Sequence, residues 1–133
     1  MATIENARLT ISTDENEQVY VSVSCDVQFT DFEVSAMNEL GLQYRLQCQL
    51  INKDLWDVEI VAVLDDQVFP RATDLKESNT RHMDLETVRP ISDLHTHVFT
   101  KDKLRAELTL RNEETGKAVV TETEVVAIDL ASL

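Results

Sequence analysis

The chain has 133 residues, 43% of them apolar, and this length and composition favour a single domain, residues 1–133, around one hydrophobic core. The 25 acidic and 12 basic residues give a net charge of −13, which excludes nucleic acid and anionic membrane surfaces as expected partners. The chain start lacks the basic residues and apolar run of a secretion signal, and no apolar stretch reaches the roughly 18 residues that span a bilayer, so we expect a cytoplasmic protein.

The first part of the chain predicts a β-hairpin. Apolar residues occupy every second position from Val19 to Phe29 and again from Ala7 to Ile11. This period of two is typical of strands that bury one face. Residues 13–18, with the sequence TDENEQ, have the composition of the turn between them.

A short helix and a further strand are predicted next. Thr30 and Glu33 have the spacing of a capping box, and Gly41 stands where a helix C-cap favours glycine, so Val34–Leu40 is expected to form two helical turns. Residues 42–50 then alternate, with their apolar positions at Leu42, Tyr44, Leu46, Cys48 and Leu50.

The middle of the chain has weaker patterns. Residues 57–65 are apolar on both faces, with Val58, Ile60, Ala62 and Leu64 on one face and Val61 and Val63 on the other. Such a strand is either covered on both sides or takes part in a subunit contact. Residues 70–81 predict a long surface loop with at most one helical turn, and residues 82–89 predict an edge strand.

The last part of the chain predicts a second hairpin. Residues 104–111 alternate strictly between apolar and polar, and residues 118–128 follow a turn in which Gly116 supplies a left-handed conformation. Together these segments predict an all-β fold, an antiparallel two-sheet β-sandwich of immunoglobulin-like architecture with about seven strands and one or two short helical turns. A closed barrel is the main alternative, although a chain with only two glycines has little means of turning barrel corners.

One candidate interface is uncharged. The solvent positions of two strands, 19–29 and 42–50, hold little charge beyond Asp26 and Arg45 in a chain with 28% charged residues. Interface centres are depleted in charge and enriched in tyrosine. The candidate interface residues are Tyr20, Ser22, Ser24, Gln28, Gln43, Gln47 and Gln49. Residues 70–111, with seven acidic and eight basic residues, are a further candidate to meet an acidic surface on another copy or another protein.

One candidate metal site involves histidines. His95 and His97 are two residues apart, so on a strand they point the same way and can share a metal ion, with Asp93 and His82 as possible additional ligands. The alternative is that they are ordinary solvent-exposed histidines, because two histidines at this spacing are weak evidence.

Other signals argue against an enzyme. Cys25 and Cys48 lie on apolar strand faces, where burial raises a thiol pKa and opposes a nucleophilic role. Ser78 and Ser92 lack the glycine-flanked turn that exposes a nucleophilic serine, and no glycine-rich phosphate loop is present, so no cofactor is expected.

Two functions remain as hypotheses. The first is a non-enzymatic protein-interaction or structural module that associates with itself or with another protein through a sheet face or an edge strand. The second is a small-ligand or metal-binding β-sandwich that uses the region of His95 and His97.

Overall fold

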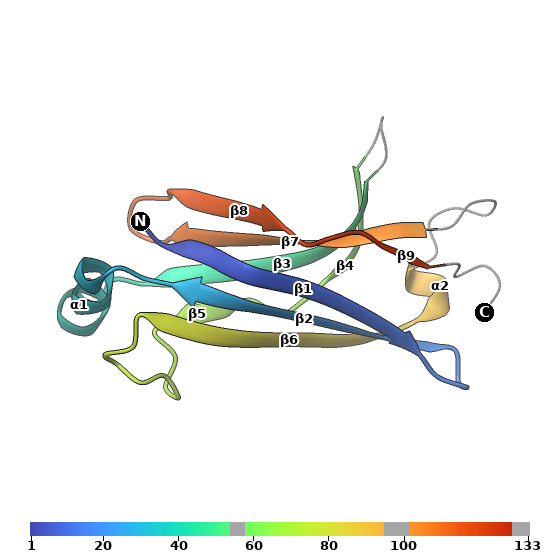
Figure 1. The fold of residues 1–133 in the computed structure, drawn as a ribbon, viewed down its shortest axis with the longest axis horizontal. Helices are drawn as coiled ribbons and strands as arrows, with labels where there is room; N and C mark the ends of the chain where they lie inside the picture. Colours follow the sequence, from blue (N-terminus) through green and yellow to red (C-terminus); the bar gives the residue numbers. More distant parts are fainter. Residues whose placement is uncertain (54–57, 95–101, 129–133) are drawn as a thin grey trace.

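The computed structural model describes residues 1–53, 58–94 and 102–128, and these form a two-sheet β-sandwich in which all strand pairings are antiparallel (Figure 1). The three-stranded sheet consists, in spatial order, of β1 (Thr3–Thr13), β2 (Gln18–Gln28) and β6 (Thr80–Pro90). The six-stranded sheet consists of β4 (Val58–Val63) and β5 (Gln67–Phe69) beside β3 (Tyr44–Lys53), followed by β7 (Asp102–Asn112) with β8 (Ala118–Glu122) and β9 (Val126–Ile128) on its other side.

The predicted class of fold is confirmed, with nine strands in the described residues rather than about seven. Two of these strands, β5 and β9, have only three residues each, and the alternation of apolar residues does not identify them as separate strands. β5 pairs with the beginning of β3, and β9 is separated from β8 because the buried Thr123 interrupts the pairing with β7. The Thr123 hydroxyl accepts a hydrogen bond from the Ala106 N–H at 3.0 Å, where a regular ladder has a backbone carbonyl.

The core lies between the sheets and follows the predicted alternation. Every second residue from Val19 to Val27 is buried on β2, as are Leu46, Cys48 and Leu50 on β3. The facing positions on β7 and β6 complete this core: Leu104, Ala106, Leu108, Leu110, Met83 and Leu85. Burying this apolar surface is the main stabilisation of the fold.

Helix α1 (Asp31–Leu40) carries the chain from β2 in one sheet to β3 in the other. The predicted capping box is confirmed, because the Thr30 hydroxyl accepts from the Glu33 N–H at 3.2 Å and the Glu33 carboxylate accepts from the Thr30 N–H at 2.8 Å. The helix therefore starts directly after Thr30, earlier than the predicted Val34. It ends as predicted at Gly41, whose φ of 72° is the left-handed conformation. A second helix, α2 (Ile91–Leu94), was not predicted.

Val58, Ile60, Ala62 and Leu64 do not share one face as predicted, because Ala62 and Leu64 are buried whereas Val58 and Ile60 are exposed. A register shift between Leu50 and Ile51 inserts an extra residue into β4, so Ala62 remains opposite the buried Leu50 while Ile60 lies opposite Ile51. Ile60 is 56% exposed and Val63 is 53% exposed. β4 is therefore an edge strand with exposed apolar side chains and is not covered on both sides, while the other alternative, a subunit contact, stays a prediction.

Candidate functional site

The predicted interface residues do not form one face. Tyr20, Ser22, Ser24 and Gln28 lie on β2, which pairs with β1 and β6. Gln47 and Gln49 lie on β3, and Gln43 is the residue directly before that strand. β3 pairs with β4, β5 and β7 in the other sheet. The expectation of a shared face was wrong, because α1 crosses between the layers and leaves the two outer surfaces on opposite sides of the sandwich.

The outer surface of the three-stranded sheet is acidic, contrary to the expected lack of charge. Neighbouring strands place charged residues beside the small polar residues of β2: Glu5 is opposite Asp26, Asp84 is opposite Ser24, and Glu86 is opposite Ser22. We call this surface the acidic face and define it by Glu5, Arg8, Tyr20, Ser22, Ser24, Asp26, His82, Asp84, Glu86 and Val88. The face thus contains four carboxylates, those of Glu5, Asp26, Asp84 and Glu86, and one arginine, Arg8.

An exposed polar cluster lies at one end of the acidic face, opposite the end that holds Tyr20 and Val88. The Nδ1 atom of His82 lies 2.8 Å from Asp26, its Nε2 atom lies 3.3 Å from Asp84, and the Asn6 amide donates to Asp26 at 2.9 Å. The hydrogen bond to Asp26 and the charge of Asp84 raise the pKa of His82. The bonds from His82 and Asn6 lower the pKa of Asp26.

Tyr20 and Val88 form the apolar part of the acidic face. They are directly opposite each other and are 43% and 47% exposed. The Tyr20 hydroxyl donates to Asp14 at 2.8 Å, and this bond lowers the pKa of Asp14. A fixed aromatic ring that is half exposed is a common anchor in protein interfaces.

The outer surface of the six-stranded sheet has a different charge balance. We call it the glutamine face and define it by Gln43, Arg45, Gln47, Gln49, Ile60, Val63, Lys103, Arg105, Glu107, Thr109, Arg111, Val120 and Glu122. The residues that define this face thus include four basic and two acidic side chains, in a chain whose net charge is −13.

Several charges of the glutamine face are paired at its rim. Arg45 donates to Glu113 at 2.6 Å and to Asp66 at 3.2 Å, and Arg105 lies 3.4 Å from Glu122. Arg111 is directly opposite Arg45, which places like charges side by side, and its guanidinium donates to the Gly116 carbonyl at 3.1 Å. Arg111, which contacts a carbonyl rather than a carboxylate, is therefore the arginine that this face offers to an acidic partner surface, and Val63 and Val120 are exposed on the same face.

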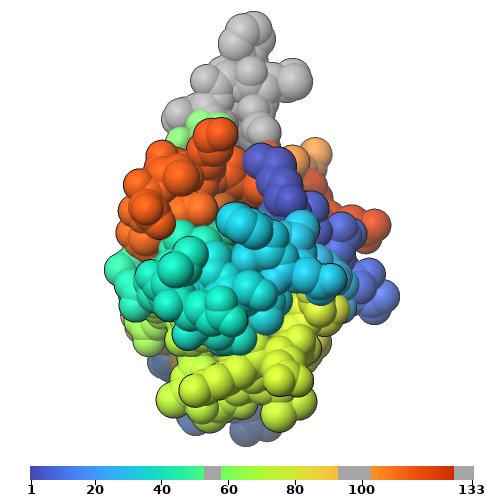
Figure 2. Space-filling model, turned by 90° about the vertical axis from the view of Figure 1, so that its left-hand side faces the viewer, coloured from blue at the N-terminus to red at the C-terminus, as the bar shows by residue number. Residues whose placement is uncertain are grey.

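A third surface lies at the end of the sandwich that α1 covers, where Figure 2 shows α1 and the loop before β6 side by side. A cavity of about 320 Å³ opens there, and its lining includes Phe32, Leu42, Tyr44 and Val119 around the buried Glu33. The Glu33 carboxylate accepts from the Tyr44 hydroxyl at 2.7 Å and from the Ala2 N–H at 3.0 Å. Burial raises the pKa of Glu33, but these bonds and that from Thr30 outweigh it, and the pKa is lowered.

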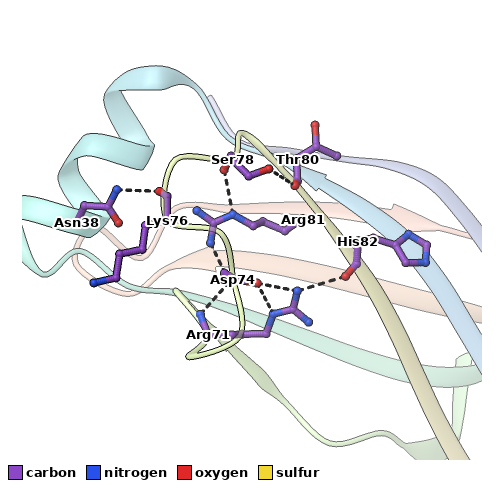
Figure 3. A network of polar contacts seen from close by, with 8 residues as sticks. All are labelled: Asn38, Arg71, Asp74, Lys76, Ser78, Thr80, Arg81 and His82. Carbon is purple, nitrogen blue, oxygen red and sulfur yellow. Dashed lines mark hydrogen bonds and ion pairs between the residues drawn. The ribbon is translucent and has the colours of Figure 1, made fainter.

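The loop between β5 and β6 is held by a buried ion pair that the sequence did not suggest. The Arg81 guanidinium donates to Asp74 at 2.7 Å, both side chains are only 2% exposed, and Arg71 donates to the same carboxylate at 2.9 Å. Figure 3 shows Asp74 between the two guanidinium groups. The Arg81 guanidinium also lies 5.7 Å from the centre of the Phe29 ring. These contacts fix the base of a loop that the sequence predicts only as irregular.

The remaining predicted residues differ in outcome. Cys25 and Cys48 are buried free thiols, as predicted, and burial raises their pKa to about 11 and about 12, which opposes nucleophilic chemistry. His95 and His97 lie outside the described residues, so the metal site stays a prediction. No group of three or more metal-ligating side chains occurs in residues 1–53, 58–94 and 102–128.

No family model matches the chain, and no curated protein matches its sequence. No helix in the described part of the chain is long and apolar enough to cross a membrane.

Proposed function

We propose that this protein is a non-enzymatic interaction module that associates with further copies of itself, the acidic face of one copy against the glutamine face of the next. The opposite charge balance of the two faces carries the proposal. Four carboxylates against Arg8 lie on one face, and the other face carries Lys103 and Arg111, which pair with no carboxylate of the described residues. Complementary charge directs which surfaces meet and in which orientation.

Apolar side chains on both faces support the same arrangement. Tyr20 and Val88 are exposed on the acidic face, and Ile60, Val63 and Val120 are exposed on the glutamine face. Two different surfaces that meet head to tail leave one free face at each end, so assembly continues beyond a dimer unless the geometry closes a ring.

The size of the smaller face sets the strength of the association. Its three strands each have 11 residues, and with strand spacings of about 4.8 Å and rises of about 3.3 Å per residue the sheet covers roughly 500 Å². A stable complex buries about 800 Å² per partner. We therefore expect weak association that depends on protein concentration and is reduced by salt.

Two charge-reversed variants test the proposal by sedimentation velocity over a series of concentrations. D84K/E86K disables the acidic face, and K103E/R111E disables the glutamine face, so each variant alone should remain monomeric. Mixing the two should restore association, since each variant keeps one functional face. E39K/E77K, outside both faces, changes the net charge as much as D84K/E86K and should associate like the wild type.

Other results would contradict this arrangement. If the mixture remains monomeric while the wild type associates, the two faces do not bind each other. If the wild type is monomeric at every concentration, self-association is absent and the interaction is with a different protein.

The proposal includes a cytoplasmic location and no binding of nucleic acid or membranes. Two buried, unpaired thiols fit a reducing compartment, and the net charge of −13 opposes binding to anionic polymers and lipids. The alternative function, metal binding near His95 and His97, is tested by metal analysis of protein purified without a tag. Stoichiometric zinc, nickel or copper would favour it.

A further inference from the structure

The outer edge of β1 is an open sheet edge. Among the described strands β1 pairs with β2 alone, and a bulge at Asn6, whose φ is 54°, interrupts this pairing before it continues regularly from Arg8 to Thr13. Residues 9–13 include no charged residue and no proline, which are the usual devices that protect a free edge from pairing. This part of the edge can therefore accept a further strand.

The register shows which peptide groups of β1 face away from β2. The Ile91 N–H donates to the Glu17 carbonyl at 2.9 Å, one step beyond the last pair of the β2–β6 ladder. Because bonded pairs alternate along an antiparallel ladder, the odd-numbered residues of β2 bond to β6 and the even-numbered residues bond to β1. The partners of these even-numbered residues on β1 are Arg8, Thr10 and Ser12. The N–H and C=O groups of Leu9 and Ile11 therefore point out of the sheet edge, and no described residue bonds to them.

The free edges of β6 and β4 are partly satisfied by arginines. On β6, the outward carbonyl of His82 accepts from the Arg71 guanidinium at 3.2 Å. On β4, the outward carbonyl of Val63 accepts from the Arg89 guanidinium at 3.4 Å. β1 has no such cap from any residue that the structure describes, so its outward donors and acceptors remain free to bond a partner strand.

A groove of about 520 Å³ lies beside this edge of β1. Residues 7–10 of β1 form one wall, and residues 124–126, at the passage from β8 to β9, form the other (Figure 1). Leu9 and Ile11 face the core but are only partly buried, and Val125 on the opposite wall is 42% exposed. A strand added beside β1 would place every second side chain in this groove, where it covers both walls.

The charges of the groove do not select a partner by sign. Arg8 lies on one wall and Glu124 on the other, and neither forms an ion pair with another described residue. The groove therefore selects its occupant by a free backbone edge and by apolar side chains at every second position.

We propose that the groove beside β1 binds an extended segment of another protein, which adds an antiparallel strand to the three-stranded sheet. The backbone of the segment exchanges hydrogen bonds with Leu9 and Ile11, and its alternate apolar side chains pack against Val125 and Val126. A second copy of the folded chain fits less well, because the inward side chains of its own β1 already pack against its own core and cannot enter the groove. These bonds lie at the edge of the sheet, so the site does not depend on association through the acidic face or the glutamine face.

The probe is a labelled peptide of alternating valine and threonine with a lysine at each end. In an antiparallel strand the valines lie opposite Leu9 and Ile11, so their side chains enter the groove and their N–H groups point at β1. N-methylation of two central valines removes these donors, whereas N-methylation of two central threonines blocks only the other edge of the peptide. Fluorescence anisotropy, at a protein concentration where the wild type is monomeric, should show binding weakened by at least about tenfold in the first case and by less than about threefold in the second.

Amide hydrogen exchange measured by NMR locates the site. In the free protein Leu9 and Ile11 should exchange faster than Thr10 and Ser12, because only the latter two donate to β2. The unmodified peptide should slow the exchange of Leu9 and Ile11 and leave that of Thr10 and Ser12 nearly unchanged.

A matched pair of protein variants tests the groove wall. Val125 lies in the groove and Val120 lies on the glutamine face, and both are exposed, so that a substitution leaves the core intact. V125K should weaken binding of the unmodified peptide by at least about fivefold, and V120K, with the same change in net charge, by less than about twofold. Circular dichroism checks that both variants are folded.

Several results would overturn the inference. No binding of the unmodified peptide, or equal losses for the two N-methylated peptides, would show that the β1 edge does not add a strand. Equal losses in V125K and V120K would show that the groove is not the site. Protection of Leu9 and Ile11 that rises with protein concentration in the absence of peptide would make a second copy the occupant. The sheet-face proposal is tested separately, because D84K/E86K and K103E/R111E leave this edge unchanged.

Discussion

His82 shows how a single residue on the acidic face responds to its neighbours. Its ring lies between Asp26 and Asp84, and the bond to Asp26 raises its pKa above the ordinary value of 6.5. Since the protonated ring is favoured in the folded state, its contribution to stability is complete below pH 6.5 and is lost as the pH rises through the folded pKa. Asp26 has a lowered pKa, so its contribution is lost in acid instead.

The variant H82Q tests this pair. Its melting temperature should fall below that of the wild type at about pH 5.5, and the difference should shrink at about pH 8.5, where the wild-type ring is largely neutral. An NMR titration should place the His82 pKa above 6.5, and D26N should lower it. A difference between H82Q and wild type that grows with pH would contradict the assigned direction.

At the scale of elements, the sequence predicted strands better than it predicted their partners. Alternation identified the buried positions of β2, β3 and β7, because it depends only on the strand's own residues. The shift at Leu50 and Ile51 depends on how β3 pairs with β4, and the interruption at Thr123 depends on a bond to Ala106. Neither leaves a periodic signal in the sequence.

The candidate surfaces were predictable only in part, because they too depend on which strands pair. Tyr20 and Gln47 were correctly placed at solvent positions, but their membership of separate sheets follows from distant pairings with β6 and β7. Arg81 gave no signal at all, because an arginine in a charged segment is normally a surface residue. Here it is 2% exposed and anchors a loop.

The loop 70–79 provides the prediction at this scale. D74A should destabilise the fold by about 3–5 kcal/mol, because it leaves the buried Arg81 guanidinium without its carboxylate. E77A, an exposed change in the same loop, should cost less than about 0.5 kcal/mol. Urea unfolding measures both. Similar small losses in the two variants would show that the buried pair contributes little to stability.

At the scale of the whole molecule, charge is the dominant feature. A net charge of −13 on 133 residues produces self-repulsion that opposes the compact state. The repulsion is unevenly distributed, since the acidic face and α1 carry an excess of carboxylates while the glutamine face carries an excess of basic residues.

Salt should therefore stabilise the monomer. Raising ionic strength from about 0.01 M to about 0.3 M shortens the screening length from about 30 Å to about 6 Å and should raise the melting temperature. The measurement is made by calorimetry at low protein concentration, so that association does not contribute. A melting temperature that is flat or falls with salt would show that local pairs such as Arg45–Glu113 outweigh the overall repulsion.

The two thiols allow the separation of the layers to be followed chemically. Cys25 lies in one sheet and Cys48 in the other, and both side chains point into the shared core. An alkylating reagent reaches neither sulfur while the layers are closed. The rate at which each becomes labelled thus reports how often that layer opens, and equal rates mean that the sandwich opens as one cooperative unit.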